Sequence, residues 1–112
     1  MPSVTPDGRE VIVPNVRADN VSIVNLGLAL AGDPGAEVAR IPLSRLDGRP
    51  ARPKGSAITP DGKYAAISAG PGEQPFSQEI GHVYMIDLRS RNVVATVTGV
   101  GNDPYALATV VR

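Results

Sequence analysis

The tetrapeptide Thr-Pro-Asp-Gly occurs twice in the chain, at residues 5–8 and at residues 59–62, an offset of 54. In a tight turn, proline presets the backbone of the second position, aspartate tolerates the third, and glycine adopts the positive φ that follows. Both copies are therefore predicted to be turns between antiparallel strands. The turn residues are Pro6, Asp7, Gly8, Pro60, Asp61 and Gly62.

The segments that follow the two turns also match each other. Residues 21–26 align with residues 83–88 at an offset of 62, and residues 38–41 align with residues 94–97 at an offset of 56. All are short runs rich in β-branched residues, which is typical of strands. Each repeat therefore contains several short antiparallel strands, and four such strands make one blade of a β-propeller.

The predicted fold class is all-β, with antiparallel four-stranded propeller blades and no long helix. Blade one covers residues 1–43, blade two covers residues 53–98, and a third blade begins at residues 104–112. The first blade is expected to lack an inner strand, because only residues 1–5 precede its turn. Predicted strands lie at 9–14, 20–26 and 37–43 in blade one, at 54–59, 63–69, 81–88 and 92–98 in blade two, and at 104–111.

These motifs resemble the YVTN β-propeller repeat. The resemblance is carried by the Pro-Asp-Gly turn, by Val-Tyr-Met-Ile-Asp-Leu at 83–88 and by Asn-Val-Val-Ala-Thr-Val at 92–97. Residues 99–104 also resemble the Gly-x-x-Pro entry to that family's next inner strand. The second-blade strand at 65–69 departs from the family's pattern, since it reads Ala-Ala-Ile-Ser-Ala. The resemblance implies a YVTN or lactonase-like propeller, usually exported to the periplasm or secreted.

Composition excludes several kinds of partner and site. Lys and Arg total 11 and Asp and Glu total 11, so the chain lacks the basic excess that nucleic acid usually requires. The absence of cysteine excludes disulfides, thiolate zinc sites and a cysteine nucleophile. No apolar stretch approaches the roughly 18 residues of a membrane helix. Residues 1–4 lack the basic and apolar regions of an export signal.

Differences between the repeat offsets locate insertions at residues 27–36, 44–52 and 70–80. Because blade strands alternate in direction, the second and third insertions share one end of the blades, here called the loop face. Ligand-binding residues concentrate on such loops, although most charged loop residues are simply solvated. The binding candidates are Arg45, Arg49, Arg52, Lys54, Glu73, Phe76 and His82.

The arginine and aromatic candidates suit particular kinds of ligand. Arginine suits bidentate capture of a phosphate or carboxylate, and Phe76 is the aromatic side chain that would anchor a partner on its loop. No metal site is predicted, because His82 is the single histidine and its co-ligands would have to come from other blades. Asn25 and Asp87 occupy the same repeat position and are expected to cap the turn that follows them.

No catalytic motif or cofactor site is predicted. The sequence contains no Gly-x-Ser-x-Gly, His-Glu-x-x-His or phosphate-binding loop. The preferred hypothesis is a non-catalytic propeller that binds a protein or a small ligand through its loops. The alternative, implied by the resemblance, is part of an enzyme propeller such as a lactonase-like hydrolase or the large subunit of a quinoprotein dehydrogenase.

Two explanations of the incomplete ring remain open. In the first, the strand at 104–111 of one copy completes the first blade of the next copy, which gives a head-to-tail homo-oligomer. In the second, which is preferred, the remaining blades belong to a longer polypeptide.

Overall fold

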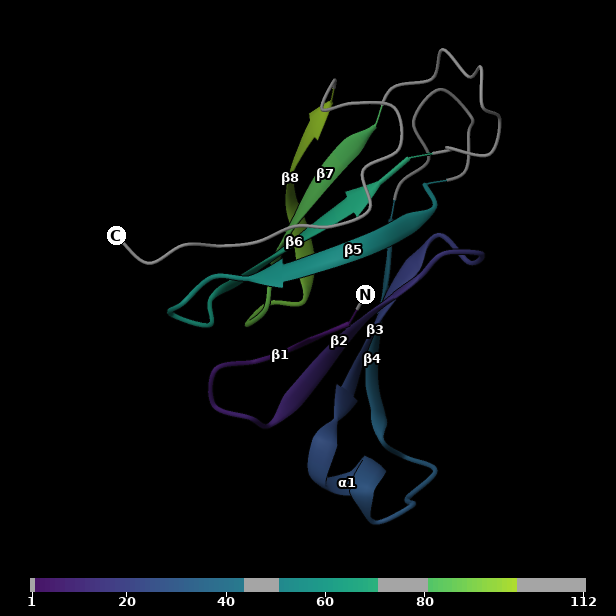
Figure 1. Cartoon of the computed structure of the whole chain (residues 1–112), viewed down its shortest axis with the longest axis vertical. Helices are drawn as coiled ribbons and strands as arrows, with labels where there is room; N and C mark the ends of the chain where they lie inside the picture. The colour runs from purple at the N-terminus through teal and green to yellow at the C-terminus, as the bar shows by residue number, and fades with distance from the viewer. Residues whose placement is uncertain (1, 44–50, 71–80, 99–112) are drawn as a thin grey trace.

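The computed structural model describes residues 2–43, 51–70 and 81–98, which form two antiparallel four-stranded sheets (Figure 1). The strand order is β1-β2-β3-β4 in the first sheet and β5-β6-β7-β8 in the second. The predicted all-β class of four-stranded blades is therefore confirmed. The third-blade strand at 104–111 lies outside the described residues.

Both blades follow the repeat closely. The first sheet consists of β1 (Ser3–Val4), β2 (Glu10–Asn15), β3 (Asn20–Asn25) and β4 (Glu37–Pro42). The second consists of β5 (Pro53–Ile58), β6 (Tyr64–Ala69), β7 (His82–Asp87) and β8 (Asn92–Thr98).

The prediction that the first blade lacks an inner strand is wrong. Residues Ser3 and Val4 form β1, which pairs antiparallel with β2 through Ser3 opposite Ile12 and Val4 opposite Val11. A strand of two residues is too short to show a hydrophobic period in the sequence. Because β1 already pairs with β2, a strand donated by a second copy would have to displace it.

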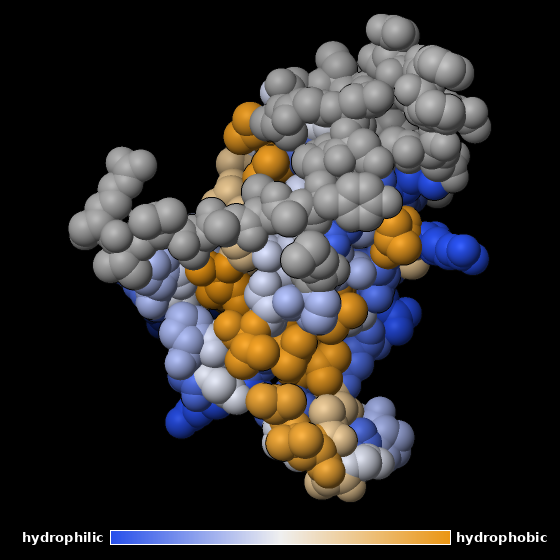
Figure 2. All heavy atoms as spheres, viewed as in Figure 1, coloured by the Kyte–Doolittle hydropathy of each residue, from blue (hydrophilic) through white to orange (hydrophobic). Residues whose placement is uncertain are grey.

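A short helix fills the insertion between β3 and β4. Helix α1 (Leu26–Leu30) begins after Asn25, whose Oδ1 accepts a hydrogen bond of 2.9 Å from the N–H of Leu28. An asparagine at this position satisfies one of the free N–H groups at a helix start. Figure 2 shows apolar residues exposed at the end of the molecule that holds α1, where Leu30 is 81% exposed. No helix in the described segments has the length and hydropathy needed to cross a membrane.

The core lies between the two sheets. The register places Ile12 opposite Ile23 on one face of blade one, and Ile67 opposite Tyr84 on one face of blade two. All four side chains are fully buried and belong to a single cluster. The inner strands β1 and β2 contact β5 across this interface, where the Ser3 Oγ lies 2.9 Å from the backbone oxygen of Ser56 and donates to it. Burial of this shared core joins the two blades.

Candidate functional site

The two Pro-Asp-Gly turns are built identically. In blade one, the Asp7 Oδ1 accepts hydrogen bonds from the Thr5 hydroxyl at 2.6 Å and from the Arg9 N–H at 3.0 Å. In blade two, the Asp61 Oδ1 accepts from the Thr59 hydroxyl at 2.7 Å and from the Lys63 N–H at 3.0 Å. These bonds favour the ionised carboxylate.

The pKa values of both turn aspartates reflect those bonds. The Thr5 hydroxyl, followed by the Arg9 N–H, lowers the pKa of Asp7 below its ordinary value. The Lys63 N–H, followed by the Thr59 hydroxyl, lowers the pKa of Asp61 in the same way. Both carboxylates are therefore charged at neutral pH and engaged by their own turns.

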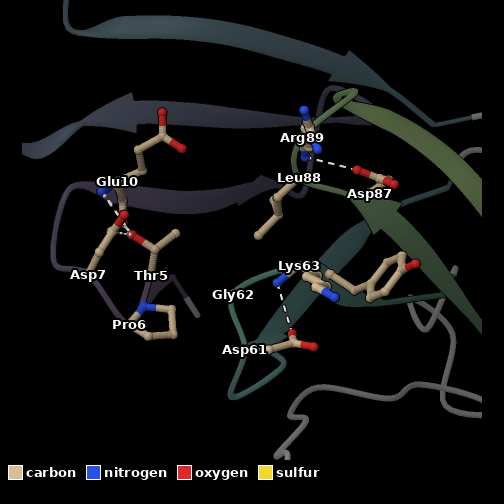
Figure 3. A pocket seen from close by; sticks show the side chains of 11 residues that line it. Thr5, Pro6, Asp7, Glu10, Asp61, Gly62, Lys63, Asp87, Leu88 and Arg89 are labelled. Atoms are coloured by element: carbon tan, nitrogen blue, oxygen red, sulfur yellow. Dashed lines mark hydrogen bonds between the residues drawn. The ribbon is translucent and has the colours of Figure 1, made fainter.

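The two turns lie side by side across a groove of about 560 Å³ between the blades (Figure 3). Pro6 lies over the second turn, since a Cβ at Gly62 would stand 3.6 Å from Pro6 Cδ. Asp87 and Arg89 line the far side, where the Asp87 Oδ1 accepts the Arg89 N–H at 2.9 Å. Because its aspartates hydrogen-bond their own backbones, the groove is explained by turn construction and does not require a ligand.

At the opposite end of the blades lies the loop face. Three of the predicted binding residues, Arg52, Lys54 and His82, are described; Arg45, Arg49, Glu73 and Phe76 lie outside the described residues. Arg52 directly precedes β5, and its backbone oxygen accepts the Gly70 N–H at 3.3 Å. His82 begins β7 opposite Ala69. Adjacent strand ends thus bring Arg52 and His82 to the same end of blade two.

Lys54 lies one residue further into β5, at a register shift between Pro53 and Gly55. A β-bulge of this kind re-aims the side chain of the extra residue. Arg52 itself has a positive φ of 50°, a backbone conformation that non-glycine residues seldom adopt outside turns. The two basic side chains therefore lie where the backbone departs from the regular ladder.

Asp19 organises the loop face, although its role was not expected from the sequence. Its backbone oxygen accepts the Leu43 N–H at 2.9 Å, at the end of blade one. Its Oδ1 accepts the Ala51 N–H at 2.9 Å and the Arg52 N–H at 3.4 Å. Asp19 thus anchors both ends of the connection from blade one to blade two. The sequence indicates this role only through the presence of an aspartate between two predicted strands.

Tyr84 and His82 are alternate residues of β7 and therefore lie on the same face of that strand. The Tyr84 side chain is fully buried, and its ring meets the His82 ring edge-on with centroids 6.5 Å apart. Burial, followed by the charge of Asp19, raises the pKa of the Tyr84 hydroxyl. The Nδ1 of His82 is buried and has no hydrogen-bond partner among the described residues. No group of three potential metal ligands occurs within the described segments.

Comparisons with known proteins describe the fold only. No family model matches the chain, and no curated protein matches it. Among solved structures, the chain is similar to hydrazine synthase from Kuenenia stuttgartiensis, with a TM-score of 0.69 and 18% sequence identity. The match covers 96% of this chain and 24% of that chain, so this chain spans about a quarter of its structural neighbour. At this identity the likeness extends to the fold and not to activity.

Proposed function

We propose that this chain is part of a YVTN-repeat propeller whose function is binding, with the loop face as the recognition surface. The observation that carries the proposal is the anchoring of Arg52 by Asp19, which fixes a basic residue at the junction of two blades. A rigid scaffold that presents loop residues at one end is the usual design of a recognition surface. The repeated turn and its flanking strands support the family assignment.

The charge of the loop face suggests the chemistry of its ligand. Arg52 and Lys54 are described there, and Arg45 and Arg49 belong to the same connection in the sequence. Guanidinium groups bind carboxylates and phosphates through paired hydrogen bonds. The proposed ligand is therefore an anionic group, carried by a protein partner or by a small molecule.

A charge-matched pair of variants tests the binding surface. Arg52→Gln with Lys54→Gln removes two positive charges from the loop face, whereas Lys63→Gln with Arg89→Gln removes two from the turn groove at the opposite end. Proteins retained by the immobilised chain are quantified, and stabilisation by phosphate and citrate is measured by thermal unfolding. The proposal requires that the loop-face variant loses partners or anion stabilisation while the groove variant keeps them. Equal behaviour of the two variants contradicts it.

An enzyme propeller is the second candidate. The observation that favours it is the Nδ1 of His82, which is buried and has no hydrogen-bond partner within the described segments. The longest natural polypeptide that contains this sequence is screened against lactones and amines, with and without a chelator. Turnover that is lost on Asp19→Asn or His82→Gln substitution would favour the enzyme, and absence of turnover would favour binding alone.

Two further parts of the proposal concern place and partners. The family resemblance supports export to the periplasm, which fractionation of the source cells checks directly. We also propose that the remaining blades belong to a longer polypeptide, with head-to-tail association of copies as the alternative, and mass measurement in solution distinguishes the two.

A further inference from the structure

Each blade ends in an outer strand, β4 in blade one and β8 in blade two (Figure 1). Within the described segments, each outer strand pairs with another strand along one side only. An edge of this kind presents a row of backbone N–H and C=O groups to which a further strand can bind. In a propeller, additional blades are arranged around the central axis, so they stack on blade faces and leave the outer edges open.

The hydrogen bonds of β4 show which of its backbone groups point away from β3. The Leu43 N–H donates to the Asp19 oxygen at 2.9 Å, so Leu43 bonds toward β3. Alternate residues of an antiparallel strand direct their backbone groups to the same side, so Ile41 also bonds toward β3. Arg40 and Pro42 therefore direct their backbone groups outward.

The outer edge of blade one carries two features that oppose strand addition. Pro42 has no N–H, so one outward donor is missing. Arg40 places a charged side chain at the other outward position, where its Nη2 lies 2.7 Å from the Glu37 Oε1. Prolines and charged side chains commonly protect edge strands from pairing.

The equivalent edge of blade two has neither feature. The repeat offset of 56 aligns Thr96 with Arg40 and Thr98 with Pro42. The register agrees, since the pairing shifts at the same repeat position in both blades. Both threonines therefore direct their N–H and C=O groups outward. Strand β8 contains no charged residue and no proline, and residues 94–98 are all exposed.

We propose that the outer edge of β8 binds an extended segment of a partner protein as an additional strand. An extended chain offers the row of donors and acceptors that matches those of an edge strand. The pairing of β7 with β8 is irregular between Met85 and Ile86 and regular over residues 95–98. The contact therefore centres on residues 95–98.

The side chains of this stretch indicate the sequence class of the partner. Val97 lies on one face of β8, and Thr96 and Thr98 lie on the other, because successive side chains of a strand alternate. Cross-strand neighbours stabilise a sheet as pairs of β-branched side chains and as hydrogen-bonded threonine or serine pairs. The preferred segment therefore alternates valine or isoleucine with threonine or serine.

A second copy of this chain is a poorer occupant of the edge. Two copies that met edge to edge would share only residues 95–98, a stretch too short to bury the roughly 1,200 Å² of a stable interface. A flexible segment can extend further and cover Val94 and Val97, which are 55% and 50% exposed.

A synthetic peptide tests the edge. The probe is a fluorophore-labelled Lys-Lys-Val-Thr-Val-Thr-Val-Lys-Lys, in which the lysines maintain solubility. The control peptide has the same side chains, but the nitrogen of each valine and threonine is methylated, which removes its backbone donors. Thr98→Pro introduces the proline of blade one, which an edge strand tolerates where the N–H faces solvent. Thr98→Ala is the matched control, because it keeps the N–H.

The probe is expected to bind the unaltered chain and Thr98→Ala with similar affinity, as measured by fluorescence anisotropy. Thr98→Pro is expected to bind about tenfold more weakly, because a backbone hydrogen bond is lost and its acceptor is left unpaired. Hydrogen exchange of the Thr96 and Thr98 amides is expected to slow when the probe binds. Circular dichroism checks the fold of both variants.

Three results would overturn the proposal: no binding of the probe, equal binding of the methylated peptide, or equal binding by Thr98→Pro. Self-association of the unaltered chain that Thr98→Pro abolishes would also overturn it, because the edge would then belong to a second copy. Sedimentation of the chain without peptide detects that outcome.

Discussion

Arg91 and Glu10 lie in different blades, and their side chains meet in a salt bridge with Arg91 Nη2 2.9 Å from Glu10 Oε2. Arg91 belongs to the turn between β7 and β8 and has a positive φ of 61°. Glu10 begins β2. The pair is partly shielded, since the Arg91 and Glu10 side chains are 34% and 24% exposed. It therefore joins the outer turn of blade two to an inner region of blade one.

A double-mutant cycle on this pair is expected to give a coupling free energy of about 1 kcal/mol, at the upper end of the range for ion pairs near a surface. The variants are Glu10→Gln, Arg91→Gln and their combination, and urea unfolding measures each. The Glu37–Arg40 pair within blade one is the control, because its side chains are more exposed and its coupling should be smaller. Equal couplings in the two cycles would contradict the prediction.

Alanine at either turn glycine is expected to destabilise the chain. Gly8 and Gly62 have φ values of +73° and +74°, and a left-handed backbone costs a side-chain-bearing residue about 1–2 kcal/mol. Gly27→Ala is the control, since Gly27 lies inside α1 and the change should stabilise the helix by roughly 0.5–1 kcal/mol. Chemical unfolding distinguishes the three variants, and a neutral Gly62→Ala would be inconsistent with the turn geometry.

Acid is expected to weaken the protein through its turn aspartates. Asp7 and Asp61 have lowered pKa values in the folded chain, so their stabilisation is complete above the ordinary value of 3.8. It is lost as the pH falls through the lower, folded pKa values, because protonation then favours the unfolded chain. Urea midpoints measured from neutral pH down to acid should fall less steeply in Asp7→Asn with Asp61→Asn than in the unaltered chain. Parallel pH profiles would rule out this origin.

Tyr84 is expected to be the most sensitive core position between the blades. It is the largest of the fully buried side chains, and truncating a buried aromatic residue to alanine costs about 3–5 kcal/mol. Tyr84→Ala should therefore lower the free energy of unfolding by a large fraction of a small domain's stability. Tyr64→Ala is the control, because Tyr64 is exposed and should lose far less. Similar losses at both tyrosines would show that the interface core is not the main source of stability.

Much of the fold was predictable because aligning the two repeats shows where each strand begins and ends. The expected strands at 92–98 and 81–88 correspond to β8 (Asn92–Thr98) and β7 (His82–Asp87). The shared position of Asn25 and Asp87 predicted hydrogen bonds to the following turn, and both side chains make them. Local patterns of this kind depend on neighbours in sequence, so a single sequence carries them.

Contacts between the blades could not be predicted, because they depend on how one blade is oriented relative to the other. The hydrogen bonds that Asp19 accepts from the blade connection and that Arg91 donates to Glu10 join positions far apart in the chain. The sequence around either residue does not predict a contact with a partner so far away in the chain. Strand β1 was missed because two residues carry no period, and α1 because an insertion has no counterpart in the other repeat.

The insertion that holds α1 is closed at its base, since the Asn25 N–H donates to the Ala36 oxygen at 2.8 Å. The pairing of β3 with β4 therefore does not depend on the residues inserted between Asn25 and Ala36. For a flexible loop, doubling the length adds only about 0.6 kcal/mol of closure entropy. The apex of α1 is thus a natural graft point: an epitope or a metal-binding peptide placed there would be displayed clear of both blade faces and of the loop face, on a scaffold whose register it does not disturb.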